Sequence, residues 1–359
     1  MVSEHSGPHF RRSNVRMLLG RKSNMRILLS ADWQFDTYDR LSTLLPEGIT
    51  SRLDEFIRCF EWAVDVARSE KCDAFAMLGD IFNARVAVDV TVLHKVCRAV
   101  FDVAEEFDFY VMAGNHDAAL RTPALNSLQT FAGSASVLDR VALVRDGVAF
   151  VPWTSDLEQL REWIDTAIAG KAKYLFSHCL VEGAVPKAKG LPVSYLRPEK
   201  FKRVFLGDVH DPVKVPPNIQ YCGAPLQINF GDEGKPRGVW VLDTATDKVQ
   251  FFQNPVSRLF HVLRSTAAFT ERKAAIRPTD YVRVECDRQD EAQAITKALG
   301  HVKWLETNAV ETVEDAPRLA VRSQDSHEDV LRRYCEHVNA RDVDGLVRVG
   351  LDILGEAKT

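Results

Sequence analysis

The chain has 359 residues, 46% of them hydrophobic, so it is long enough to bury one large core and a smaller domain. Its 46 Lys and Arg against 50 Asp and Glu give a formal charge of -4, which excludes a protein that attracts nucleic acid through a global positive charge. Any basic binding surface must therefore be local.

Cysteine usage and hydropathy bear on the compartment. The seven cysteines are odd in number and scattered, without CxxC spacing, which indicates reduced thiols in a reducing compartment. No apolar run reaches the roughly 18 residues of a membrane helix, and the N-terminus lacks the apolar core of a signal peptide. We therefore expect a cytoplasmic protein that does not enter a membrane.

Residues 1–24 are polar and rich in arginine, with Glu4 as their one acidic residue. They show no clear period, so the first interpretation is a disordered basic leader. A basic arm that contacts nucleic acid is the sharper alternative. Met25 stands directly before the first strand-like run.

From Met25 onward the first half of the chain alternates strands with helices. Short apolar runs predict buried strands, and apolar residues at helical spacing predict the helices. The expected strands are 26–30, 74–78 and 109–113, and the expected helices are 51–69 and 88–107. This alternation indicates parallel strands in an α/β fold.

The alternation resumes after a hairpin. Residues 141–151 alternate in hydropathy around a turn at Asp146-Gly147, as a β-hairpin does. A helix is predicted over 157–169, strands over 173–177 and 203–206, and a closing hairpin over 238–252. The domain is expected to end between residues 255 and 264.

Two smaller units are expected beyond this domain. A strand at 280–285, a helix at 290–299 and a strand at 302–305 predict a compact α+β unit. After a polar stretch, amphipathic segments at 327–339 and 343–354 predict a helical hairpin. The fold class is therefore α/β, with a small α+β domain and a C-terminal hairpin.

Polar residues cluster where the predicted strands end. The clearest case is Gly114-Asn115-His116-Asp117 after the strand at 109–113. Such a cluster could be an ordinary turn, and a lone histidine is more often a packing residue than a ligand. Five such strand ends are hard to explain in that way, because the carboxyl ends of parallel strands share one sheet edge. The candidates at these ends are Asp32, Gln34, Asp80, Asn115, His116, His178, Asp208 and His210.

These candidates suit a hard or borderline metal. Carboxylate, carboxamide and imidazole donors without a thiolate favour Mn²⁺, Mg²⁺, Fe or Zn²⁺. The strand-end motifs together resemble the calcineurin-like metallophosphoesterase superfamily, with a domain over 25–258. The resemblance implies a four-layer αββα sandwich and two divalent metal ions bridged by Asp80. It assigns Asp32, Gln34 and His210 to the first metal, and Asn115, His178 and Asp208 to the second.

The resemblance also implies catalytic roles. Two cations roughly 3.5–4 Å apart can clamp a phosphoryl group while a metal-bound hydroxide attacks in line. His116, which is not assigned as a ligand, would stabilise charge or protonate the leaving oxygen. Asp117 would orient the His116 ring.

Two positions depart from the family pattern. Gln34 and Asp208 stand where histidines are usual, so each replaces a nitrogen donor with an oxygen. An oxygen-rich site favours Mn²⁺ or Mg²⁺ over Zn²⁺. We therefore expect two Mn²⁺ ions, with Mg²⁺ as the alternative. The two departures also allow the alternative that the metal site is weakened.

Finer details resemble the nucleases of DNA double-strand-break repair, the SbcD-type exonuclease subunits and their viral recombination counterparts. The shared features are Asp32-Trp33, Gly79-Asp80-Ile81-Phe82 and the segment Tyr221–Asp232, which is the most specific. This resemblance implies an exonuclease or endonuclease that acts on DNA ends in repair, recombination or replication. It also implies a homodimer with a coiled-coil ABC-type ATPase partner, in a bacterial or host cytoplasm.

The same resemblance implies roles for the rest of the chain. Residues 265–322 would form a capping domain that positions DNA, and the hairpin at 326–356 would dock on the ATPase. The alternatives are a structural appendage and a hairpin that packs on the chain's own core. Candidate phosphate contacts lie beside or between ligand-bearing strand ends, although a solvated basic loop is the alternative. These candidates are Arg85, Arg121, Lys187 and Lys189.

Two other functions would use the same features. A small-substrate metallophosphatase or cyclic-nucleotide phosphodiesterase would need the same metals, but it has less need of the residues after 255. A non-catalytic scaffold would keep the fold with a degraded metal site.

Overall fold

The computed structural model describes residues 24–119, 123–307, 325–338 and 340–356. The predicted basic leader, apart from residue 24, and the candidate Arg121 lie outside these described residues. The chain forms two compact units. The first comprises the described residues up to His261, with Arg277–Val282 and Val302–Trp304; the second comprises Val262–Ile276, Arg283–His301 and the described residues from Leu305 onward.

The first unit contains two six-stranded sheets, and one of them holds the strands predicted near the N-terminus. Strands β1 to β4 run parallel, and β11 joins β1 in the antiparallel direction. Helices α1 (Ser51–Ser69) and α2 (Val90–Val103) lie in the crossovers. In sheet order the strands are β12 (Lys248–Gln253), β11 (Gly238–Asp243), β1 (Arg26–Ser30), β2 (Ala74–Leu78), β3 (Asp108–Met112) and β4 (Ser136–Leu138).

The other sheet has a similar parallel centre. Strands β6, β7, β8 and β10 run parallel, and α3 (Leu157–Ala169) connects β6 to β7. The predicted hairpin at Asp146-Gly147 joins β5 to β6 in antiparallel register. In sheet order the strands are β5 (Ala142–Val144), β6 (Val148–Val151), β7 (Tyr174–His178), β8 (Arg203–Gly207), β10 (Ile219–Tyr221) and β9 (Lys214–Val215).

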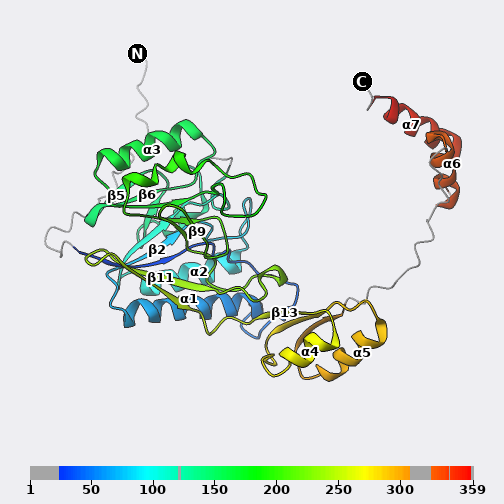
Figure 1. The fold of residues 1–359 in the computed structure, drawn as a ribbon, viewed down its shortest axis with the longest axis horizontal. Coiled ribbons are helices and arrows are strands. Elements are labelled where there is room, and N and C mark those ends of the chain that lie inside the picture. Colours follow the sequence, from blue (N-terminus) through cyan, green and yellow to red (C-terminus); the bar gives the residue numbers. More distant parts are fainter. Residues whose placement is uncertain (1–23, 120–122, 308–324, 339, 357–359) are drawn as a thin grey trace, which may run out of the picture. The chain divides into compact units, whose positions relative to one another are not determined.

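Three apolar clusters show how these elements form layers. Core residues of α1 and α2 pack with one face of the first sheet, and those of α3 pack with one face of the second. A third cluster joins the inner faces of the two sheets, where the ring centroids of Tyr110 and Phe150 lie 5.1 Å apart. Figure 1 shows α3 on one side of the sheets and α1 and α2 on the other. The predicted four-layer αββα sandwich is confirmed.

Side-chain caps explain where the helices begin. The side chain of Asp89 accepts hydrogen bonds from the amides of Thr91 (2.7 Å) and Val92 (3.3 Å), so α2 begins at Val90. The predicted helix over 88–107 was therefore too long at both ends, because α2 already ends at Val103. The helix predicted over 157–169 has the observed bounds, with Asp156 as its cap.

A third sheet has the strand order β13 (Phe260–Leu263), β14 (Tyr281–Val284) and β15 (Trp304–Thr307). The second unit includes the contacting helices α4 (Thr266–Arg272) and α5 (Gln289–Ala298). The sequence patterns do not predict β4, β9, β10, β13 or α4. These elements are short, so they carry too little periodicity to stand out.

Two further helices form the predicted hairpin. Helix α6 (His327–His337) contacts α7 (Val343–Glu356), and Arg332 pairs with Asp344 at 2.7 Å. Cys335 and Val347 are buried, whereas Tyr334 and Ile353 are exposed. The domain limits 265–322 and 326–356 remain predictions. Among the described helices, none combines the length and apolar character needed to cross a membrane.

A buried ion pair in α1 ties distant parts of the first unit together. The side chains of Arg52 and Glu55 are 2% and 0% exposed, and Nη1 of Arg52 lies 2.6 Å from Oε2 of Glu55. Arg52 also donates to the carbonyl oxygen of Gln227 at 2.5 Å, and the hydroxyl of Tyr281 donates to Glu55 at 3.0 Å. The guanidinium also faces the ring of Phe260, at 5.3 Å from its centroid. Each charge is therefore paired and hydrogen-bonded, as burial requires.

Replacing Arg52 with leucine should lower the free energy of unfolding by about 3–5 kcal/mol, because Glu55 would stay buried without its partner. Urea unfolding followed by circular dichroism measures this change. Arg58 in the same helix is the control, since it pairs with Asp54 at 2.9 Å while 47% exposed. Arg58→Leu should cost at most about 1 kcal/mol. Equal losses in both variants would contradict a special role for the buried pair.

Candidate metal centre

The carboxyl ends of β1, β2 and β7 bring three buried side chains together. Asp32 and Asp80 each follow their strand by two residues, and His178 is the last residue of β7. Ligand atoms of Asp32, Asp80 and His178 all lie within 4.8 Å of one another. Parallel strands of the two sheets end at the same edge, so the fold itself creates this group.

Hydrogen bonding fixes the tautomer of His178. Its Nδ1 lies 2.7 Å from the carbonyl oxygen of Leu78, so Nδ1 donates and Nε2 is the ring nitrogen that faces the group. Nε2 lies 3.3 Å from Oδ1 of Asp80 and 3.9 Å from Oδ1 of Asp208. A histidine that ligates a metal is usually a neutral imidazole whose other ring nitrogen donates a hydrogen bond, as Nδ1 does here.

Negative charge accumulates where water is excluded. Burial, together with the nearby carboxylates of Asp80 and Asp208, raises the pKa of Asp32 to about 8. Burial alone would lower the pKa of His178, but the carboxylates of Asp80, Asp32 and Asp208 raise it well above its ordinary range. Both shifts mean that this group attracts positive charge, which a divalent cation would supply.

The amide of Asn115 tests whether a cation fits. As placed, its Oδ1 lies 3.0 Å from Nε2 of His178, and this end of the amide lies 3.1 and 3.2 Å from the two oxygens of Asp80. In this orientation Oδ1 faces the two carboxylate oxygens of Asp80, which cannot donate to it. A cation among them would satisfy all of these acceptors at once. The donor set of carboxylates, imidazole and amide oxygen fits a divalent metal.

The backbone at these strand ends is left-handed at four residues other than glycine. The φ angles are 53° at Asp32, 46° at Gln34, 54° at Asp80 and 89° at Asp208. Such conformations are costly and persist where surrounding bonds enforce them. Here the amides of Asp32 and Gln34 donate to the carbonyl oxygens of Gly79 (3.0 Å) and Asp80 (2.9 Å). These backbone hydrogen bonds therefore connect the loop after β1 to the loop after β2.

The remaining predicted ligands lie beside this group. The carboxylate of Asp32 accepts from the amide of Asp208 at 3.0 Å, which fixes the start of that loop. The carbonyl oxygen of His210 accepts from the amide of Ala224 at 2.9 Å. Asp208 and His210 are not members of the group of three. Ligand roles for Gln34, Asp208 and His210 therefore remain predictions.

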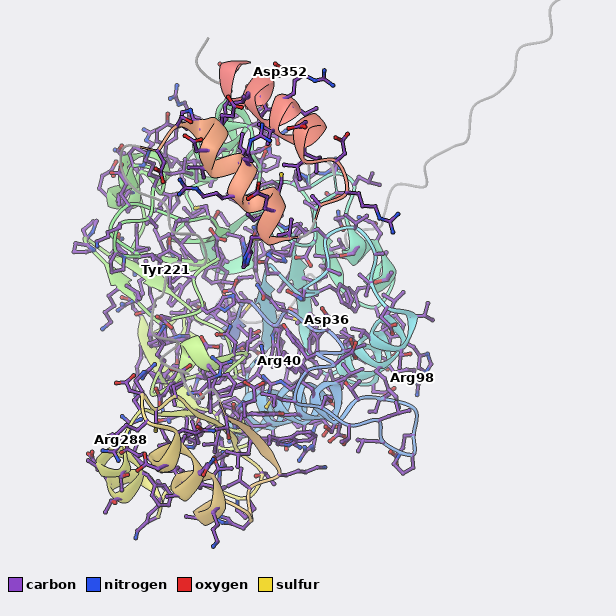
Figure 2. The ribbon with its side chains drawn as sticks, turned by 90° about the vertical axis from the view of Figure 1, so that its right-hand side faces the viewer. Asp36, Arg40, Arg98, Tyr221, Arg288 and Asp352 are labelled. Carbon is purple, nitrogen blue, oxygen red and sulfur yellow. The ribbon has the colours of Figure 1, made fainter. Side chains whose placement is uncertain are left out.

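Tyr221, labelled in Figure 2, ties the segment Tyr221–Asp232 to this site. It is fully buried, and its hydroxyl accepts from the amide of Val181 and donates to the carbonyl oxygen of Cys179, each at 2.9 Å. Cys179 directly follows His178. The segment thus supports the chain at the end of β7.

The structure corrects the expected partner of His116. Nδ1 of His116 lies 2.6 Å from the carbonyl oxygen of Asn83, and Nε2 lies 3.9 Å from Oδ2 of Asp80. The carboxylate of Asp117 instead accepts from the backbone amides of Gly114 (2.9 Å), Ile81 (3.0 Å) and Phe82 (3.3 Å). Asp117 therefore shapes two strand-end loops, and Asn83 orients the ring. Sequence carries no signal for a backbone carbonyl partner.

The candidate phosphate contacts differ in their surroundings. Arg85 is exposed, and its Nη2 lies 3.0 Å from the end of the Asn115 amide that points away from Asp80. Lys187 and Lys189 are exposed in a loop between Val181 and Leu191, which form a bridge at its base. The structure therefore brings Arg85 to the site.

Gly114 leaves no room for a side chain beside the metal centre. A Cβ there would overlap Oδ1 of Asp80 and come within 2.9 Å of Cε1 of His178. Overpacking of this kind costs about 1–3 kcal/mol, so Gly114→Ala should weaken Mn²⁺ binding by about tenfold or more. Isothermal titration calorimetry measures this. Gly300→Ala is the control, because its Cβ would meet nothing closer than 3.5 Å; unchanged binding in Gly114→Ala would refute this geometry.

Comparison with known proteins supports metal-dependent phosphoester hydrolysis. The model of the calcineurin-like phosphoesterase family matches residues 25–212. Exonuclease subunit 1 of Enterobacteria phage T4 is 25% identical over 222 residues, which cover 56% of this chain and 63% of that protein. The chain thus matches less than two thirds of the length of this curated relative.

Three solved structures are similar to this chain at low sequence identity. A dimetal phosphatase from Danio rerio is 13% identical, with a TM-score of 0.44, over 65% of this chain and 96% of its own. The phosphoesterase Yfce from E. coli is 13% identical, with a TM-score of 0.33, over 64% and 100%. The nuclease MPE from Pseudomonas putida is 14% identical, with a TM-score of 0.30, over 63% and 87%. Since the family model covers more than half of the chain and its strand ends form the buried acceptor group, the protein belongs to the calcineurin-like phosphoesterase family.

Proposed function

We propose that this protein is a metal-dependent nuclease that hydrolyses phosphodiester bonds at DNA ends. The observation that carries the hydrolytic part is the buried group of Asp32, Asp80 and His178, which is built to hold a cation. The DNA part is supported by the phage T4 relative, whose name is that of an exonuclease subunit. The resemblance of the segment Tyr221–Asp232 to repair nucleases supports it further.

The strand-end residues would hold two divalent metal ions. Asp80 lies centrally, since its oxygens approach His178, His116 and Asn115, and it would bridge the two ions. The predicted ligands are Asp32, Gln34 and His210 for one ion, and Asn115, His178 and Asp208 for the other. Bound ions would polarise the phosphoryl group and supply a hydroxide nucleophile. The oxygen-rich donor set favours Mn²⁺, with Mg²⁺ as the alternative.

His116 would act on the leaving group. Nδ1 donates a hydrogen bond to the carbonyl oxygen of Asn83, so Nε2 is the ring atom available to the substrate. From there His116 would stabilise charge or, when protonated, donate a proton to the leaving oxygen. Asp117 would serve catalysis indirectly, because its carboxylate keeps the Gly114 loop in place.

The phosphate contacts and partners form the finer part of the proposal. Arg85 would bind phosphates near the metals, Lys187 and Lys189 would add further contacts, and Arg121 is the fourth predicted phosphate contact. Residues 265–322 would cap the DNA. The hairpin at 326–356 would dock on a coiled-coil ATPase of the ABC type, and its exposed Tyr334 and Ile353 suit an apolar partner. The protein would work as a homodimer in the cytoplasm, in repair, recombination or replication.

One assay separates the candidate functions. Wild-type protein with Mn²⁺ should degrade linear duplex DNA and hydrolyse a small aryl phosphodiester, and His116→Ala should slow both reactions by about 10²–10⁴. Exposed His94 in α2 is the matched control, and His94→Ala should leave both rates unchanged. Hydrolysis of the small ester alone would favour a small-substrate phosphatase or cyclic-nucleotide phosphodiesterase. No hydrolysis of either substrate would favour a scaffold with a degraded site.

Phosphate contacts should also appear in the salt dependence of binding. Arg85→Ala and Arg121→Ala should each weaken binding to unrelated duplex sequences alike, because phosphates carry no sequence information. Each should reduce the slope of log K against log salt concentration by about 0.9. Fluorescence anisotropy at several salt concentrations measures both effects. An unchanged slope would count against a phosphate contact at that position.

A further inference from the structure

The side-chain amide of Asn115 has one end at the metal-ligand group and the other at the guanidinium of Arg85. One end faces the oxygens of Asp80 at 3.1 and 3.2 Å and Nε2 of His178 at 3.0 Å, while the other end lies 3.0 Å from Nη2 of Arg85. An amide offers an accepting oxygen at one end and a donating nitrogen at the other. Its two orientations therefore suit different charge states of the site.

In the metal-free protein one orientation satisfies both ends. The amide nitrogen donates to Asp80, and the amide oxygen accepts from Arg85. The guanidinium of Arg85 is then held against Asn115. Both ends of the amide then face a partner of the opposite kind.

As a metal ligand, Asn115 must turn the other way. Its oxygen then points toward Asp80 and His178, and its nitrogen points toward Arg85. Two donors 3.0 Å apart cannot bond to one another, so both need an acceptor. A non-bridging oxygen of a phosphoester substrate is an acceptor that can serve both, with charge assistance from the guanidinium.

We infer that Asn115 couples metal binding to phosphate recognition by Arg85. When Asn115 ligates a metal, it releases Arg85, and Nδ2 of Asn115 and the guanidinium of Arg85 together bind a phosphate oxygen. This inference rests on the proposed function, because it takes Asn115 as a ligand. It makes Arg85 a phosphate contact that forms in the metal-loaded protein and not before.

Metal affinity in a double-mutant cycle tests the coupling. Arg85→Ala removes a hydrogen bond that stabilises the metal-free orientation, so it should tighten Mn²⁺ binding about fivefold by isothermal titration calorimetry of the full chain. Loss of a positive charge would tighten binding too, and the cycle separates the causes. In an Asn115→Ala background, Arg85→Ala should change the affinity by less than about twofold. Equal tightening in both backgrounds, or none in the wild-type background, would overturn the inference.

Inorganic phosphate is the second probe. With saturating Mn²⁺, Arg85→Ala should weaken phosphate binding about tenfold, because a hydrogen bond to a charged group is lost; without metal it should have no effect. An equal effect without metal would overturn the inference. Arg98→Ala, at a side chain 63% exposed on α2, controls for loss of a surface arginine, and circular dichroism confirms folding. Wild-type protein that binds no Mn²⁺ would refute the metal centre itself, whereas an additive cycle would refute only the coupling.

Discussion

The structure depends on one electrostatic constraint, which is that acceptors of both sheets meet where water is excluded. Asp32, Asp80 and His178 converge within 4.8 Å, and burial raises the pKa of Asp32 to about 8. A buried carboxylate without a counter-charge is expensive. The strand ends are therefore organised for a positive charge that comes from outside. A bound cation would offset the free-energy cost of burying these carboxylates.

The backbone around the site adopts strained, left-handed conformations. Left-handed residues such as Asp32 and Asp80 remain in place because Asp117 and neighbouring carbonyl groups fix their loops. Gly79 and Gly114 allow these loops to approach, since a Cβ at either position would overlap the site. Rigid loops of this kind keep the ligands in position before a metal arrives, which lowers the ordering entropy that binding must overcome.

Simple rules predicted the alternation of strands and helices and the sheet edge where the candidate site lies, whereas the four layers were expected from the family resemblance. Parallel strands leave their carboxyl ends at one edge, so polar groups after β1, β2 and β7 had to meet there. The sequence could not predict that Asn83 orients His116 through a backbone carbonyl, since every residue has one. Nor could it show that the Asp117 carboxylate turns to backbone amides. The ends of α2 and the shortest strands depend on caps and tertiary pairing, which leave little periodicity.

The segment Tyr221–Asp232 shows how a motif can support a function without contacting the substrate. Tyr221 is buried and anchors Cys179 beside His178, and the carbonyl oxygen of Gln227 receives Arg52 of the buried ion pair. The carboxylate of Asp232 accepts from the amide of Ile228 and pairs with buried Arg237. These contacts give the segment a scaffolding role between the metal centre and α1. In the proposed nuclease this segment would therefore be part of the scaffold, and contact with DNA would come from exposed groups such as Arg85.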